Sequence, residues 1–102
     1  MAEFVRVSAQ SELPQPGRVA EFTVNGRPLC VANVQGEICV LDGTCPHEGG
    51  QLGEGALEGK RVVCPWHSFA FDVHTGETEH APDLQAEVLE AKVENGELRV
   101  KL

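Results

Sequence analysis

Two short segments dominate this sequence of 102 residues: Cys45-Pro46-His47 and, after sixteen intervening residues, Cys64-Pro65-Trp66-His67. Each segment supplies one cysteine sulfur and one histidine nitrogen, and both kinds of donor bind transition metals. The prolines stiffen the backbone beside the donors. The sequence therefore predicts a metal centre with two sulfur and two nitrogen ligands, which are Cys45, His47, Cys64 and His67.

Two kinds of metal centre accept this donor set. In a 2Fe–2S cluster with mixed ligands, thiolates hold one iron and neutral histidines hold the other, which raises the reduction potential. A structural zinc ion also accepts two cysteines and two histidines. Zinc fingers, however, usually group cysteine with cysteine and histidine with histidine. Here each segment contains one of each, so the spacing favours the iron–sulfur cluster and leaves zinc as the alternative.

The rest of the chain predicts an all-β fold. Short alternating or β-branched runs recur with turn residues between them, and the Asn-Gly pairs at 25–26 and 95–96 are strong hairpin signals. Residues 83–93 are rich in Ala, Leu and Glu, which leaves a helix open there, although the run into an Asn-Gly turn favours a strand. The expected strands are 4–7, 19–24, 29–34, 37–41, 60–64, 69–73, 86–93 and 97–102.

Residues 42–59 differ from the rest because they contain six glycines and little apolar periodicity. A phosphate-binding loop is excluded, since Gly59-Lys60 is followed by Arg61 and not by Ser or Thr. We expect a loop that wraps a metal centre with its backbone amides directed inward.

Length and charge narrow the classes of function. A chain of this length predicts one domain, residues 1–102. It has no apolar run long enough to cross a membrane and no basic segment followed by an apolar one, so we expect a cytoplasmic location. The net charge of −8 argues against binding to nucleic acid or anionic membranes. It suits solubility, and it also suits steering toward a basic face of a redox partner.

Four other cysteines and histidines match no ligand position. Cys30 and Cys39 lie within apolar runs, so we expect small buried core residues, with a disulfide between them as the less favoured alternative. His74 and His80 are expected to be ordinary surface or hydrogen-bonded histidines.

The order CPH, sixteen residues, CPWH resembles the Rieske 2Fe–2S domain family, and residues 69–77 resemble the pattern that follows its second ligand pair. The resemblance is strongest over residues 42–82 and extends to the whole chain in length and strand order. It implies a Rieske-like antiparallel β-sandwich with a small cluster-binding subdomain of two loops. In such a domain, Cys45 and Cys64 would bind the inner iron.

The histidines would bind the outer iron. His47 and His67 would each use one ring nitrogen and expose the other, which implies that the reduction potential falls with rising pH. Rieske proteins of the cytochrome bc type carry two further cysteines, whose positions here are Gly50 and Trp66, and this chain contains no tyrosine. Without a tyrosine hydroxyl, fewer hydrogen bonds reach the cluster. This implies a reduction potential near the low end of the Rieske range, on the order of −150 mV.

The resemblance implies a small Rieske ferredoxin with one 2Fe–2S cluster per chain. It would be a one-electron carrier and not an enzyme, receiving electrons from a flavin-dependent NAD(P)H reductase and passing them to a terminal oxygenase. The first alternative is the small subunit of an NADH-dependent nitrite reductase. A zinc-stabilised interaction module and a detached oxygenase domain are the others.

Overall fold

The computed structural model describes residues 3–44, 51–65, 69–79 and 84–102. The all-β prediction is confirmed, with three antiparallel sheets among these residues. Two short 3-10 helices, η1 (Gln10–Glu12) and η2 (Leu52–Glu54), connect them. The first sheet contains β1 (Phe4–Ala9), β10 (Glu97–Lys101) and β9 (Ala91–Glu94). The middle sheet contains β2 (Val19–Val24), β3 (Arg27–Val34), β4 (Glu37–Asp42) and β8 (Val88–Leu89). The third contains β5 (Ala56–Glu58), β6 (Arg61–Val63) and β7 (Ala70–Asp72).

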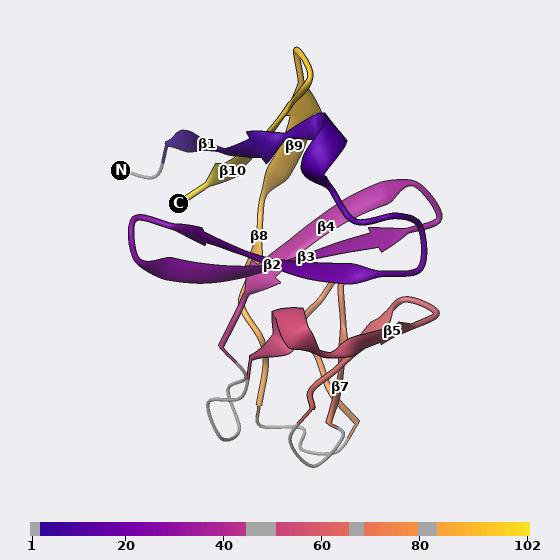
Figure 1. Cartoon of the computed structure of the whole chain (residues 1–102). Coiled ribbons are helices and arrows are strands. Elements are labelled where there is room, and N and C mark those ends of the chain that lie inside the picture. Colours follow the sequence, from indigo (N-terminus) through magenta and orange to yellow (C-terminus); the bar gives the residue numbers. More distant parts are fainter. Residues whose placement is uncertain (1–2, 45–50, 66–68, 80–83) are drawn as a thin grey trace.

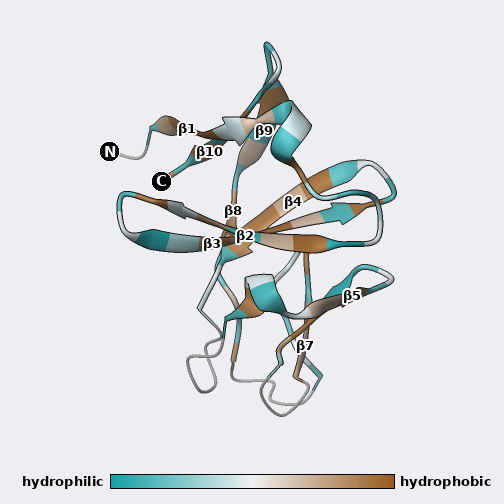
Figure 2. Ribbon diagram, viewed as in Figure 1, coloured by the Kyte–Doolittle hydropathy of each residue, from teal (hydrophilic) through white to brown (hydrophobic). Residues whose placement is uncertain are grey.

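The middle sheet lies between the other two (Figure 1). Because side chains alternate between the faces of a strand, neighbouring residues of β3 enter different cores. Val31 pairs with Val40 and belongs to the core shared with the first sheet. Cys30 pairs with Leu41 and belongs to the core that also contains Phe71 of the third sheet. The middle strands are accordingly apolar along much of their length (Figure 2).

The hairpin turns agree with the sequence prediction. Asn25 and Gly26 have φ angles of 53° and 80°, and Asn95 and Gly96 have 55° and 75°. Both pairs thus occupy the left-handed region that a two-residue turn requires and that Asn-Gly tolerates well. The meander of β2, β3 and β4 and the β9–β10 hairpin are therefore confirmed.

Two sequence predictions were wrong. Residues 86–93 do not form one strand, because β8 pairs with β4 of the middle sheet whereas β9 pairs with β10 of the first. The chain changes sheets at Glu90, whose carbonyl accepts a hydrogen bond from the Lys101 amide at 2.8 Å.

The second error concerns residues 42–59, whose described part is more than a loop, since it contains η2 and strand β5. Glycine permits this pairing, because a Cβ atom at Gly55 would lie 1.9 Å from the Val63 carbonyl oxygen.

Candidate metal centre

The third sheet and η2 lie at the end of the molecule farthest from β1 and β10 (Figure 1). Three stretches of the sequence beside them lie outside the described residues, and their described flanks are Thr44 and Gln51, Pro65 and Phe69, and Glu79 and Leu84. The segments between these flanks are called the first, second and third loops. Seven residues singled out in the sequence fall between these flanks and lie outside the described residues: Cys45, Pro46, His47, Gly50, Trp66, His67 and His80. The structure thus shows how the bases of the loops are held.

The first loop is closed at its base by backbone pairing. Thr44 forms an antiparallel bridge with Gln51, and the Leu52 amide donates to the Gly43 carbonyl at 2.9 Å. The Asp42 carboxylate accepts a hydrogen bond from the Thr44 amide at 2.9 Å. These contacts fix the points where the chain leaves β4 and enters η2. The segment with Cys45 and His47 begins and ends between them.

The second loop begins at Cys64, which follows β6 directly. The Cys64 amide donates to the Phe69 carbonyl at 2.7 Å, so the chain returns beside the point where it left. Cys64 is 1 % exposed and packs in the same core as Val62 and Phe71. Burying a phenylalanine such as Phe71 contributes roughly 1.5–3 kcal/mol. This core therefore fixes the position of the Cys64 backbone.

The third segment is tied to the turn that follows β7. Glu77 forms an antiparallel bridge with Gln85, and the Ala86 amide donates to the Gly76 carbonyl at 2.8 Å. The Gln85 side chain donates to the Thr75 carbonyl at 2.6 Å. A Cβ atom at Gly76, where φ is +79°, would lie 2.0 Å from the Ala86 carbonyl oxygen. Glycine is needed here for both its φ angle and its lack of a side chain.

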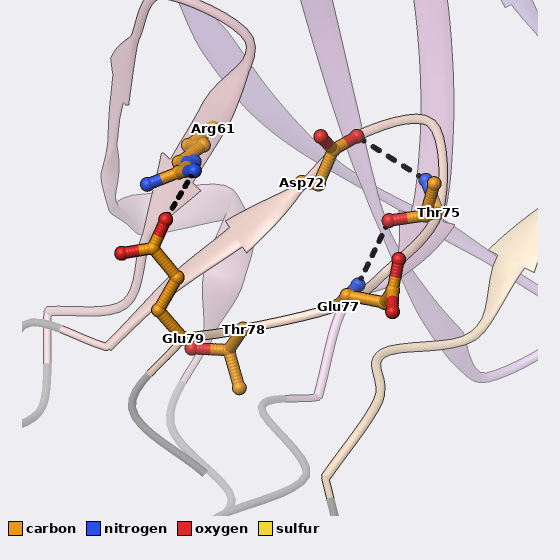
Figure 3. A pocket seen from close by; sticks show the side chains of 6 residues that line it. All are labelled: Arg61, Asp72, Thr75, Glu77, Thr78 and Glu79. Carbon is orange, nitrogen blue, oxygen red and sulfur yellow. Dashed lines mark hydrogen bonds and ion pairs between the residues drawn. The ribbon is translucent and has the colours of Figure 1, made fainter. Parts of the chain in front are cut away.

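Asp72 organises the same turn (Figure 3). Its carboxylate accepts hydrogen bonds from the His74 amide at 2.8 Å and the Thr75 amide at 3.2 Å. Burial by itself would raise the pKa of Asp72. The two amide hydrogen bonds, together with the charges of Lys60 and His74, outweigh burial and lower that pKa below its ordinary value of 3.8. The carboxylate is therefore ionised when it holds the turn.

A shallow polar pocket of about 280 Å³ lies beside this turn. Arg61 of β6 and Glu79 form an ion pair across it at 2.6 Å (Figure 3). Both side chains are largely exposed, so the pair contributes little stability. Its effect is to join β6 to the chain that enters the third loop.

Cys30 and Cys39 are buried, as predicted, and form no disulfide. Burial and the nearby Glu21 raise the pKa of Cys30 to about 12. Burial, followed by the charges of Glu37 and Asp72, raises the pKa of Cys39 to about 11. Neither residue lies at a loop base, so both are unsuitable as cluster ligands.

Of the four expected ligands, the structure describes Cys64 alone. Its place fits a thiolate ligand, since it lies at a loop base and follows a strand that is anchored in the core. The donor set of the four residues fits a 2Fe–2S cluster with mixed ligands. His74 is not among them, because it lies in the turn after β7 and contacts Glu37 at 3.0 Å, as a hydrogen-bonded surface histidine does.

The chain resembles known proteins over most of its length. The family described as the Rieske 2Fe-2S domain matches residues 3–98. The ferredoxin component of the naphthalene 1,2-dioxygenase system from Pseudomonas putida is 39% identical over 87 residues, which are 84% of this chain and 82% of the relative. A solved structure described as a complex of reduced oxygenase and oxidized ferredoxin in carbazole 1,9a-dioxygenase contains a chain that is 33% identical, with a TM-score of 0.85. The match covers 96% of this chain and 92% of that one.

A third protein resembles this chain in its fold alone. The putative NADH-dependent nitrite reductase small subunit from Mycobacterium tuberculosis has a TM-score of 0.87 but 20% identity, over 100% of this chain and 96% of that one. Separately, no helix in the described part of this chain has the length and apolar character needed to cross a membrane.

The two roles of Gly76 can be separated by comparison with Gly26, which has a similar φ of +80° but open space around it. Gly26→Ala introduces only the strain of a left-handed backbone, which destabilises the fold by about 1–2 kcal/mol. Each kcal/mol lost lowers Tm by roughly 4–8 °C. Gly76→Ala meets the Ala86 carbonyl as well, so we expect a clearly larger fall. Thermal unfolding followed by circular dichroism measures both variants. Equal falls would contradict a close approach at Gly76.

Asp72 makes the stability of the turn depend on pH. Because its pKa is lower in the folded chain than in the unfolded one, its carboxylate stabilises the fold above the ordinary value of 3.8, and this stabilisation is lost as the pH falls through the folded value. Asp72→Asn keeps the acceptor oxygen and removes the charge. We expect the variant to be less stable than the parent at neutral pH and the difference to shrink below pH 3.8, as measured by urea unfolding. A difference that does not change with pH would contradict this account.

Proposed function

The chain belongs to the Rieske 2Fe–2S family and is a ferredoxin of dioxygenase systems, and on this basis we propose that its cluster is bound by Cys45, His47, Cys64 and His67. A ferredoxin is an electron carrier and not itself the catalyst. The observation that best supports the proposed ligands is Cys64, which is buried at a loop base directly after β6. Family membership speaks against the zinc-stabilised module.

The bound cluster supplies reversible one-electron chemistry. The chain's own residues hold the ligands in place for it. Backbone pairing at Thr44–Gln51 and the hydrogen bond from Cys64 to Phe69 keep both loop bases fixed. Burial of Cys64 excludes water from one side of the site. Ligands on rigid supports change position little between two oxidation states, which suits repeated electron transfer.

The partners follow from the relatives. We propose that the chain docks transiently on a terminal oxygenase, since a chain 33% identical to it is described in a complex of oxygenase and ferredoxin. A flavin-dependent NAD(P)H reductase would supply the electrons. The net charge of −8 would steer the chain toward a basic face of either partner and speed the encounter. We also propose that residues 1–102 act as one domain; the cytoplasmic location stays a prediction.

The ligand assignment is tested by single substitutions with matched controls. We expect Cys64→Ser and His67→Gln to lose the Rieske signal in the EPR spectrum of the reduced protein and most of the bound iron. Cys30→Ala and His74→Gln remove the same donor types from positions outside the site and should keep both. For the parent protein we expect a midpoint potential on the order of −150 mV.

Other results would contradict the ligand assignment or the expected potential. An intact signal in Cys64→Ser, or its loss in His74→Gln, would contradict the assignment. A clearly positive potential would contradict the inference drawn from the absent tyrosine and the absent second pair of loop cysteines.

A further inference from the structure

A second group of potential metal ligands lies apart from the loops. The ligand atoms of Glu37, Cys39 and His74 all lie within 4.8 Å of one another. We propose that these three residues form a binding site for one Zn²⁺ ion, independent of the iron–sulfur cluster. The site would join β4 of the middle sheet to the turn that follows β7 of the third sheet.

The fold brings these residues together from two distant segments. Glu37 and Cys39 are two positions apart on β4, so their side chains point to the same face of the strand. That face packs toward the third sheet, because Cys39 belongs to the core that contains Phe71. His74 reaches the same place from the turn organised by Asp72, and its Nε2 lies 3.0 Å from a Glu37 carboxylate oxygen.

The donor set and spacing suit zinc. Zinc binds cysteine sulfur, histidine nitrogen and carboxylate oxygen in a tetrahedron, at about 2.0–2.3 Å, and such ligand atoms lie roughly 3.3–3.8 Å from one another. The three ligand atoms here span 4.8 Å at most. The side chains of Glu37 and His74 are 61% and 43% exposed, so rotation of these two can bring the atoms into range. The fourth position would be open to water.

The surroundings favour a cation. The Asp72 carboxylate lies 3.8 Å from His74 Nδ1, the ring nitrogen that faces away from Glu37. At that distance the carboxylate makes no hydrogen bond to the ring, but its negative charge favours a cation beside it. Glu37 and Asp72 together place negative charge beside Cys39, and Lys60, at 3.8 Å from the other Asp72 oxygen, offsets part of it. On binding, the Cys39 S–H bond breaks, a Zn–S bond forms and the proton passes to solvent.

The experiment adds one equivalent of Zn²⁺ to the protein with its cluster in place, removes unbound metal, and measures zinc and iron per chain. We expect one zinc per chain with the iron content unchanged. X-ray absorption at the zinc edge should show one sulfur at about 2.3 Å and nitrogen or oxygen at about 2.0–2.2 Å. Zinc should also raise Tm, since it binds the folded chain in preference to the unfolded one.

Substitutions of the proposed ligands test where the zinc ion binds. His74→Gln changes an exposed side chain, so it should fold, and we expect at least a tenfold loss of zinc affinity and of the zinc-induced rise in Tm. Cys39→Ala should remove the sulfur contribution. Glu58→Gln, an exposed carboxylate of β5, is the control and should bind zinc as the parent does.

Three results would overturn the proposal: equal zinc binding by His74→Gln and the parent, a zinc spectrum without sulfur, or zinc uptake matched by loss of iron. The iron content of the loop variants tests the cluster ligands separately, because those variants leave Glu37, Cys39 and His74 intact.

Discussion

The burial of β3 and β4 on both faces is the constraint on which the rest of the structure depends. One face of these strands packs on the first sheet and the other on the third. The strands of the third sheet are three residues long, which is too short to be stable alone. Their order comes from the core in which Leu41 of β4 lies with Phe71 of β7. Cys64 belongs to that core, so the position of this expected ligand depends on the middle sheet.

Each of the three loops is held at its base by backbone hydrogen bonds. Backbone pairs close the first loop between Thr44 and Gln51 and the third between Glu77 and Gln85. The second returns through the hydrogen bond from Cys64 to Phe69. Rigid strands that present functional loops are a common solution to positioning chemistry at a surface. Here the bases of the first two loops adjoin η2 and the third sheet, the part of the molecule that holds Cys64.

Local sequence signals predicted the elements that depend on local physics. Asn25-Gly26 and Asn95-Gly96 predicted two hairpins because few other residues tolerate their φ angles. The split at Glu90 was not predictable, since an alternating pattern shows that a strand is half-buried but not which sheet it joins. Strand β5 was missed because the glycines around it conceal its short apolar pattern. The proposed ligand residues come from the spacing of the two Cys/His segments, whereas the contact of His74 with Glu37 depends on tertiary packing and leaves no sequence signal.

We propose that two histidines and two cysteines from the first two loops bind one 2Fe–2S cluster. The most direct test is pulsed EPR of the reduced protein with ¹⁵N-labelled histidine, which detects nitrogen bonded to the iron. Two strong histidine couplings in the parent protein are the predicted result. An absence of strong nitrogen coupling, or coupling to one histidine alone, would contradict it.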